Sequence, residues 1–152
     1  MTADLKKSKE ILTATNSACV AVKDGVLLAS EERGIRPLLG WMQREERLRG
    51  FCVADKVVGK AAALLMVCLG VREVYAKTVS EPAVSVFEKH AIPHWYGEKV
   101  SRIANRAGDG LCPMEECCMG IDDPAVAHEA LLRQVAIMMQ GNTPESPMRN
   151  NS

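Results

Sequence analysis

A long apolar stretch in the middle of the chain, AAALLMVCLGV at residues 61–71, constrains the fold more than any other feature. Together with the residues before it, this stretch predicts a helix over residues 56–69 that is apolar almost all round. Such a helix has no face for water, so we expect it to be heavily buried against a sheet. Gly70 is a typical residue to end it.

The segments around this helix alternate between extended and helical patterns. Residues 51–54, 71–79 and 92–97 are typical of strands. Residues 80–90 between the last two predict a helix that begins after a capping serine, Ser80. Strand, helix, strand, helix, strand is the pattern of right-handed parallel crossovers.

The N-terminal part predicts a different arrangement. Residues 2–15 predict a helix, and two β-prone runs flank Asp24-Gly25, a strong signal for a hairpin turn. Residues 34–48 predict a second helix. We therefore expect an α/β fold, a three-layer α/β/α sandwich in which an N-terminal antiparallel hairpin precedes parallel strand-helix units.

The C-terminal part predicts one more helix, from residue 124 to about residue 139. Residues 1–140 are then a single domain. The tail at residues 141–152 has turn formers and no apolar rhythm, so we expect it to be disordered.

Charge and composition exclude several classes of partner. Nineteen basic residues balance nineteen acidic ones, so no global field attracts nucleic acid or an anionic membrane. The apolar run is shorter than the roughly 20 residues that a membrane span requires, and the N-terminus MTADLKKSKE is unlike a signal peptide. We expect a cytoplasmic protein whose six cysteines are reduced thiols.

Ligands of such folds bind beyond the carboxyl ends of the strands, which here selects residues 55–60 and 78–82. In the first segment, Asp55 is placed to cap the apolar helix, and Lys56 and Lys60 would share one helical face. A helix start with two ammonium groups favours an anion. The alternative is that the lysine stems simply run along apolar surface to water.

The stretch NRAGDGLCPMEECCMG at residues 105–120 gathers further reactive side chains. Its cysteines lack the C-x-x-C spacing of structural zinc, so we expect no metal and no cofactor. Cys112 precedes a proline that can open a short helix, a position that suits a nucleophile. No general base adjoins it in sequence, which favours a small buried filler. Glu115 could cap its own helix or reach Lys60, and the sequence leaves both open.

The run VYAKTVSEPAVSVFEKHAIPHWYG resembles the second half of the zinc deaminase core, in which E-P-C-x-x-C opens a helix. Glu81-Pro82 match that motif, but Ala83 and Val86 stand at the two cysteine positions. Gly59 and Ala61 stand where the resemblance places the histidine and glutamate of H-x-E. Because these residues bind zinc and move protons in that family, the usual hydrolytic deamination is not supported.

The chain more closely resembles an uncharacterised prokaryotic family with a cytidine-deaminase-like fold. RGIRPLL, VADKVVGKAAALL, VSEPA and NRAGDGLCPMEE carry this resemblance, which spans roughly residues 3–135. That family has no assigned activity. The resemblance therefore implies the fold and leaves the function open.

The first functional hypothesis is a zinc-free domain that binds a small anionic ligand, for example a nucleotide. In this hypothesis Lys56, Lys60 and Ser80 bind the anion. Asp55, Glu81 and Glu115 orient the lysines or accept hydrogen bonds from the ligand. Arg106 binds the ligand from another side. Whether the protein is an enzyme stays open; catalysis would use Lys60 as a base or Cys112 as a nucleophile. The alternatives are a non-catalytic oligomeric or regulatory module with a vestigial pocket, and a thiol enzyme that uses Cys112. A homo-oligomer is compatible with the first of these alternatives.

Overall fold

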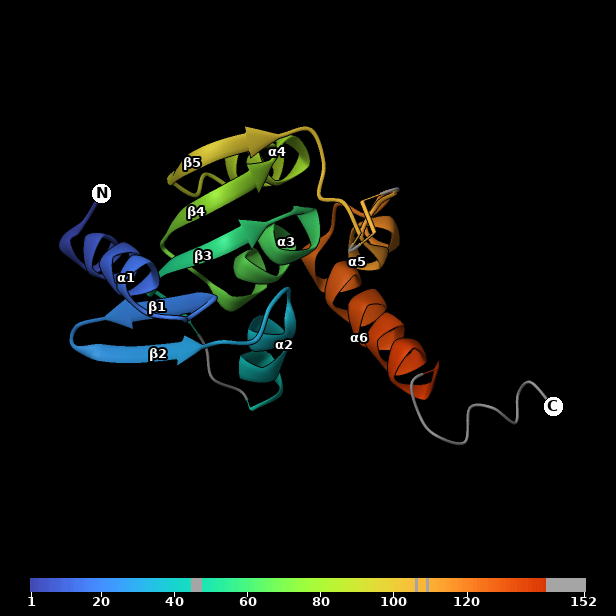
Figure 1. Ribbon diagram of the computed structural model, residues 1–152, viewed down its shortest axis with the longest axis horizontal. Helices are drawn as coiled ribbons and strands as arrows, with labels where there is room; N and C mark the ends of the chain where they lie inside the picture. The colour runs from blue at the N-terminus through green and yellow to red at the C-terminus, as the bar shows by residue number, and fades with distance from the viewer. Residues whose placement is uncertain (45–47, 106, 109, 142–152) are drawn as a thin grey trace, which may run out of the picture.

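The computed structural model describes residues 1–44, 48–105, 107–108 and 110–141 (Figure 1). Its strands are β1 (Cys19–Lys23), β2 (Val26–Ser30), β3 (Cys52–Val58), β4 (Glu73–Ser80) and β5 (His94–Val100). Its helices are α1 (Ala3–Ala14), α2 (Arg36–Gln43), α3 (Lys60–Leu69), α4 (Glu81–Lys89), α5 (Pro113–Cys117) and α6 (Pro124–Gly141). The mixed α/β architecture expected from the sequence is confirmed.

The strands form one sheet in the order β2-β1-β3-β4-β5. β1 pairs antiparallel with both β2 and β3, whereas β3, β4 and β5 are parallel. The hairpin turns at Asp24-Gly25, where both residues have positive φ (45° and 84°), as the favoured two-residue turn requires. The predicted antiparallel hairpin and parallel units are therefore correct.

The boundary between β3 and α3 differs from the prediction. β3 continues to Val58 and pairs with β4 through Val57 and Val58, so the helix begins at Lys60 instead of residue 56. Valines are stiff and favour extended backbone, which outweighs the helical apolar pattern here. The N-cap residue is Gly59, so the prediction that Asp55 caps this helix is wrong.

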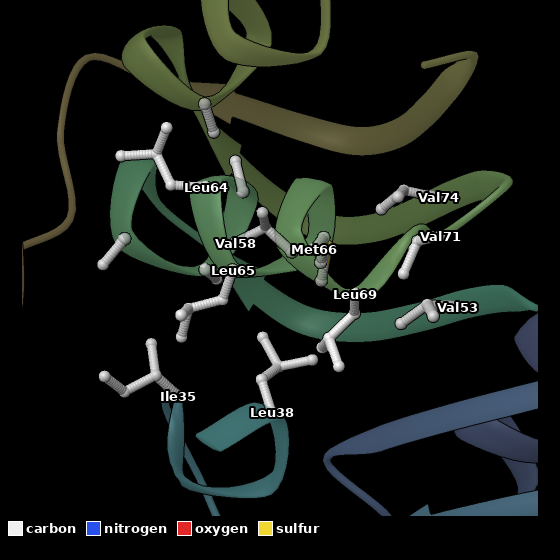
Figure 2. Packing of buried hydrophobic residues seen from close by; sticks show 14 of the residues in the cluster. Ile35, Leu38, Val53, Val58, Leu64, Leu65, Met66, Leu69, Val71 and Val74 are labelled. Carbon is white, nitrogen blue, oxygen red and sulfur yellow. The ribbon is translucent and has the colours of Figure 1, made fainter. Parts of the chain in front are cut away.

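Helices cover both faces of the sheet. α1 packs against β1 and β3 on one face, and α2, α3 and α4 lie on the other, with α6 outside α3 (Figure 1). Figure 2 shows the main core, where α3 residues Leu65 and Leu69 face Ile35 and Leu38 near α2. α3 is buried on most of its circumference, as its composition predicts. None of the helices in the described residues is long and apolar enough to cross a bilayer.

Candidate functional site

The carboxyl ends of β3 and β4 lead into α3 and α4, and α5 lies against the start of α3. Glu115 of α5 binds this helix start with both carboxylate oxygens. Its Oε1 accepts the Lys60 N–H at 2.8 Å, and its Oε2 accepts the Ala61 N–H at 2.9 Å. Because these N–H groups have no partner within the helix, the chain supplies its own anion there.

Gly59 makes room for this carboxylate. A Cβ atom on residue 59 would lie 2.4 Å from the Glu115 Oε1 atom and 2.7 Å from Oε2. The backbone of Gly59 has φ −102°, which any residue can adopt. The glycine is therefore required by the close approach of Glu115 and not by an unusual backbone conformation.

The side chain of Lys60 is bound by the segment after α5. Its Nζ lies 3.2 Å from Asp122 Oδ1 and donates to the carbonyl of Met119 at 3.4 Å. The Lys60 side chain is 14% exposed, whereas that of Asp122 is 74% exposed. The acid is thus the more accessible partner of this ion pair.

A pocket of about 330 Å³ opens beside Lys60. It lies between the start of α3, one side of α4 and the residues before α6. Its lining combines cations, polar groups and apolar surface from Lys60, Pro82, Ser85, Val86, Lys89, His90 and Asp122. The Nε2 atom of His90 is buried and has no hydrogen-bond partner among the described residues.

Among the described residues, Lys60 is the one predicted ligand-binding or catalytic residue that lines this pocket, and Pro82 of the selected segment 78–82 lines it too. Ser80 is fully buried and its Oγ accepts the Ala83 N–H at 3.2 Å, so it caps α4 as predicted but has a partner inside the protein. Glu81 is exposed at the start of α4. Lys56 lies within β3, so it does not share a helical face with Lys60 as predicted. Arg106 lies outside the described residues.

Asp55 has an unusual environment within β3. It is 4% exposed and lies opposite Cys19 of β1. Burial raises its pKa from 3.8 to about 7, although the Val57 N–H and the Cys19 thiol bind its carboxylate. Its Oδ2 atom has no hydrogen-bond partner in the described part of the chain. Asp55 is thus a buried carboxyl group apart from the pocket, and not the helix cap that the sequence pattern indicated.

The cysteines are free thiols. Cys112 is the N-cap residue of α5, and its side chain makes no capping hydrogen bond to that helix. Burial raises the pKa of Cys118 to about 12, which favours an unreactive thiol there. Among the described residues, no three His, Cys, Asp or Glu side chains are grouped to hold a metal ion.

On the α4 side of the pocket, the sequence indicated the start of the helix at residues 78–82 but not Ser85, Lys89 or His90. Ser85 and Lys89 are four residues apart on a helix, a spacing typical of an ordinary solvated face. Asp122 is recognised as part of the site only once α5 is placed against α3. The one available signal was the polar face of α4 directly after the predicted strand-end site.

The fold and the site together define a mixed α/β domain with a five-stranded sheet and a polar pocket beside Lys60, and the zinc ligands of the deaminase motif are missing. The positions that resemble those ligands carry Gly59, Ala61, Ala83 and Val86, which have no metal-binding side-chain atom. The last three are buried in the core. The chain belongs to the DUF1893 family, a domain of unknown function, whose family model matches residues 7–135.

Two solved structures are similar to this chain to different degrees. A DUF1893 family protein from Thermotoga maritima, solved at 2.70 Å resolution, is similar with a TM-score of 0.81 and 26% sequence identity. The similarity covers 88% of this chain and 92% of that one, in agreement with the family assignment. The apo dCMP deaminase of cyanophage S-TIM5 is weakly similar, with a TM-score of 0.42 and 15% identity over 62% of this chain and 94% of that one. No curated protein matches the chain in sequence.

Proposed function

We propose that the protein binds a small anionic molecule in the pocket between α3 and α4. The observation that carries this proposal is the gathering of Lys60, Lys89 and His90 around one hollow of about 330 Å³. This volume lies at the lower end of the range typical of small-molecule sites. The set of residues differs from the one expected from sequence, because among the described residues Lys60 alone belongs to both.

The lining indicates how such a ligand would be held. Lys60 and Lys89 are ammonium donors, Ser85 offers a hydroxyl group, and His90 offers a ring nitrogen that has no partner in the described part of the protein. A phosphate or carboxylate accepts bonds from all of these groups. Pro82 and Val86 give apolar surface for the rest of the molecule.

The first backbone N–H groups of α3 do not take part in this anion site. Its first N–H groups are already bound by Glu115. The Lys60 side chain instead exchanges its exposed partner, Asp122, for the ligand. The exposure of Asp122 supports this binding role for Lys60, and no reaction is assigned to the protein.

Replacement of Lys60 by methionine tests the proposal. We expect wild-type protein to be stabilised in a thermal-shift panel by one or more of inorganic phosphate, nucleoside monophosphates, sugar phosphates and dicarboxylates. Lys60→Met and Lys89→Met should each weaken the affinity for that compound by about tenfold or more, because each removes a charged partner of the anion.

The matched control is Lys56→Met, which removes a lysine from β3 that does not line the pocket. It should bind the compound as wild type does. Equal affinity in all three variants, or a wild-type protein that no compound in the panel stabilises, would rule out the proposed site.

A further inference from the structure

β5 forms one edge of the sheet, and β4 is its only strand partner in the described residues (Figure 1). The carbonyl of Pro93 accepts the Val74 N–H at 3.1 Å, so it points toward β4. Backbone groups of successive residues in a strand point to opposite sides. The N–H and C=O groups of the even-numbered residues, His94, Tyr96, Glu98 and Val100, therefore point outward from the sheet.

This edge is open and long enough to pair. β5 has seven residues and contains no proline. Its central residues are exposed, with Tyr96 at 42%. Exposed strand edges of this kind are templates for a further strand.

We propose that two copies of the chain pair through β5, antiparallel and centred on Gly97, so that their two five-stranded sheets join into one. Residues with outward-facing backbone groups must lie opposite one another for the strands to exchange hydrogen bonds. A two-fold axis at Gly97 meets this condition and pairs Tyr96 with Glu98 of the second copy. It also uses every residue of β5.

The side chains of this register complement each other. Tyr96 lies opposite Glu98, so a phenol can donate to a carboxylate, and Trp95 lies opposite Lys99, so an ammonium meets an indole ring. Each pair occurs twice because of the symmetry. A two-fold axis at Tyr96 or at Glu98 is off the centre of β5 and would leave strand residues unpaired. An axis at Glu98 would also place two carboxylates opposite each other.

Gly97 suits the position on the axis. Its backbone lies so close to β4 that a Cβ atom there would be 2.9 Å from the Lys77 carbonyl oxygen. The residue on the axis belongs to a pair without mutual hydrogen bonds, in which the two backbones approach most closely. Two glycines meeting there bring no side chains into conflict. This inference does not depend on the ligand site.

Sedimentation analysis of the full chain across a dilution series tests the pairing. We expect a monomer–dimer equilibrium in the wild type. Tyr96→Pro removes an outward-facing N–H and no bond to β4, so the variant should keep its circular dichroism spectrum and raise the dimer dissociation constant by about tenfold or more. Tyr96→Ala retains this N–H and should weaken the dimer less than Tyr96→Pro.

Hydrogen exchange of the wild type provides a readout that does not depend on whether a variant folds. The amides of Tyr96 and Glu98 should exchange more slowly at high protein concentration than at low concentration, whereas those of Val26 and Leu27 on the opposite edge should not change. A wild-type chain that stays monomeric throughout the series, or a folded Tyr96→Pro variant that dimerises as wild type does, would overturn the pairing. A dimer that protects only other amides would also overturn it.

Discussion

Replacing Glu115 by alanine is expected to lower the free energy of unfolding by about 2 to 3 kcal/mol. The carboxylate accepts two backbone N–H groups at the start of α3, at 2.8 and 2.9 Å, and is largely buried. Alanine would leave these donors without their partner and would remove a negative charge from the positive end of the helix. For a domain of this size the midpoint of thermal unfolding should fall by about 2 to 4 °C for each kcal/mol.

Gly59→Ala is the matching change on the other side of this contact. Its Cβ atom would overlap the Glu115 carboxylate and displace it, so the variant should lose much of the same stabilisation. Without Glu115, alanine in place of glycine at an N-cap costs about 1 kcal/mol, which is less than the loss expected from displacing the carboxylate. The two substitutions should therefore be strongly non-additive.

Urea denaturation of the wild type, the two single variants and the double variant measures this coupling. The double variant should be close in stability to Glu115→Ala alone. Fully additive effects would mean that Gly59 and Glu115 act separately, contrary to the structure. Glu116→Ala, next to Glu115 in α5, is the control and should change stability little.

Replacing Asp55 by asparagine is expected to stabilise the protein increasingly as the pH rises. Burial raises the pKa of Asp55 to about 7, so between pH 3.8 and about 7 the native state holds a proton that the unfolded chain has lost. The stability that this proton contributes is fully present below the pKa of Asp55 in the unfolded chain, 3.8. It is lost as the pH rises through the pKa of Asp55 in the native state, about 7. The difference between these two pKa values corresponds to about 4 kcal/mol in the free energy of unfolding.

The asparagine side chain cannot ionise, so this loss disappears in the variant. The advantage of Asp55→Asn over wild type should grow by about 2 to 3 kcal/mol between about pH 5 and pH 8. Urea denaturation at several pH values checks this, with Glu32→Gln as the control at an exposed position. Parallel pH profiles for wild type and Asp55→Asn would show that the carboxyl group ionises at an ordinary pH in the native state.

The fold was largely predictable because its signals are local. The Asp24-Gly25 turn, the Ser80 cap and the apolar character of residues 61–69 each depend on neighbouring residues, and the structure confirms each. The start of α3 was predicted wrongly because Val57 and Val58 fit both an apolar helix and a strand. Pairing with β4, which is a long-range interaction, decides in favour of the strand.

The site was predictable only in part, because its decisive contacts join distant residues. Lys60 was selected because it lies near the start of an apolar helix that follows a strand. The contact between Glu115 and the Lys60 N–H spans 55 residues, and no local pattern distinguishes it from a cap of its own helix. Lys89 and His90 look like a solvated end of α4 until Asp122 is placed across from them.

These contacts move the proposed anion site away from the position that the sequence predicts. The sequence places the anion at the start of α3, but Glu115 already binds the N–H groups there. The cations of the pocket are side chains, on Lys60 and along α4. We therefore propose that ligands bind at the α4 side of Lys60.

An NMR titration of ¹⁵N-labelled protein with inorganic phosphate tests this claim most directly. We expect saturable shifts of the amides of Ser85, Lys89 and His90 and of the His90 ring, with no change in the hairpin of β1 and β2. Phosphate that causes no saturable shift in α4, or only shifts in other elements, would contradict it.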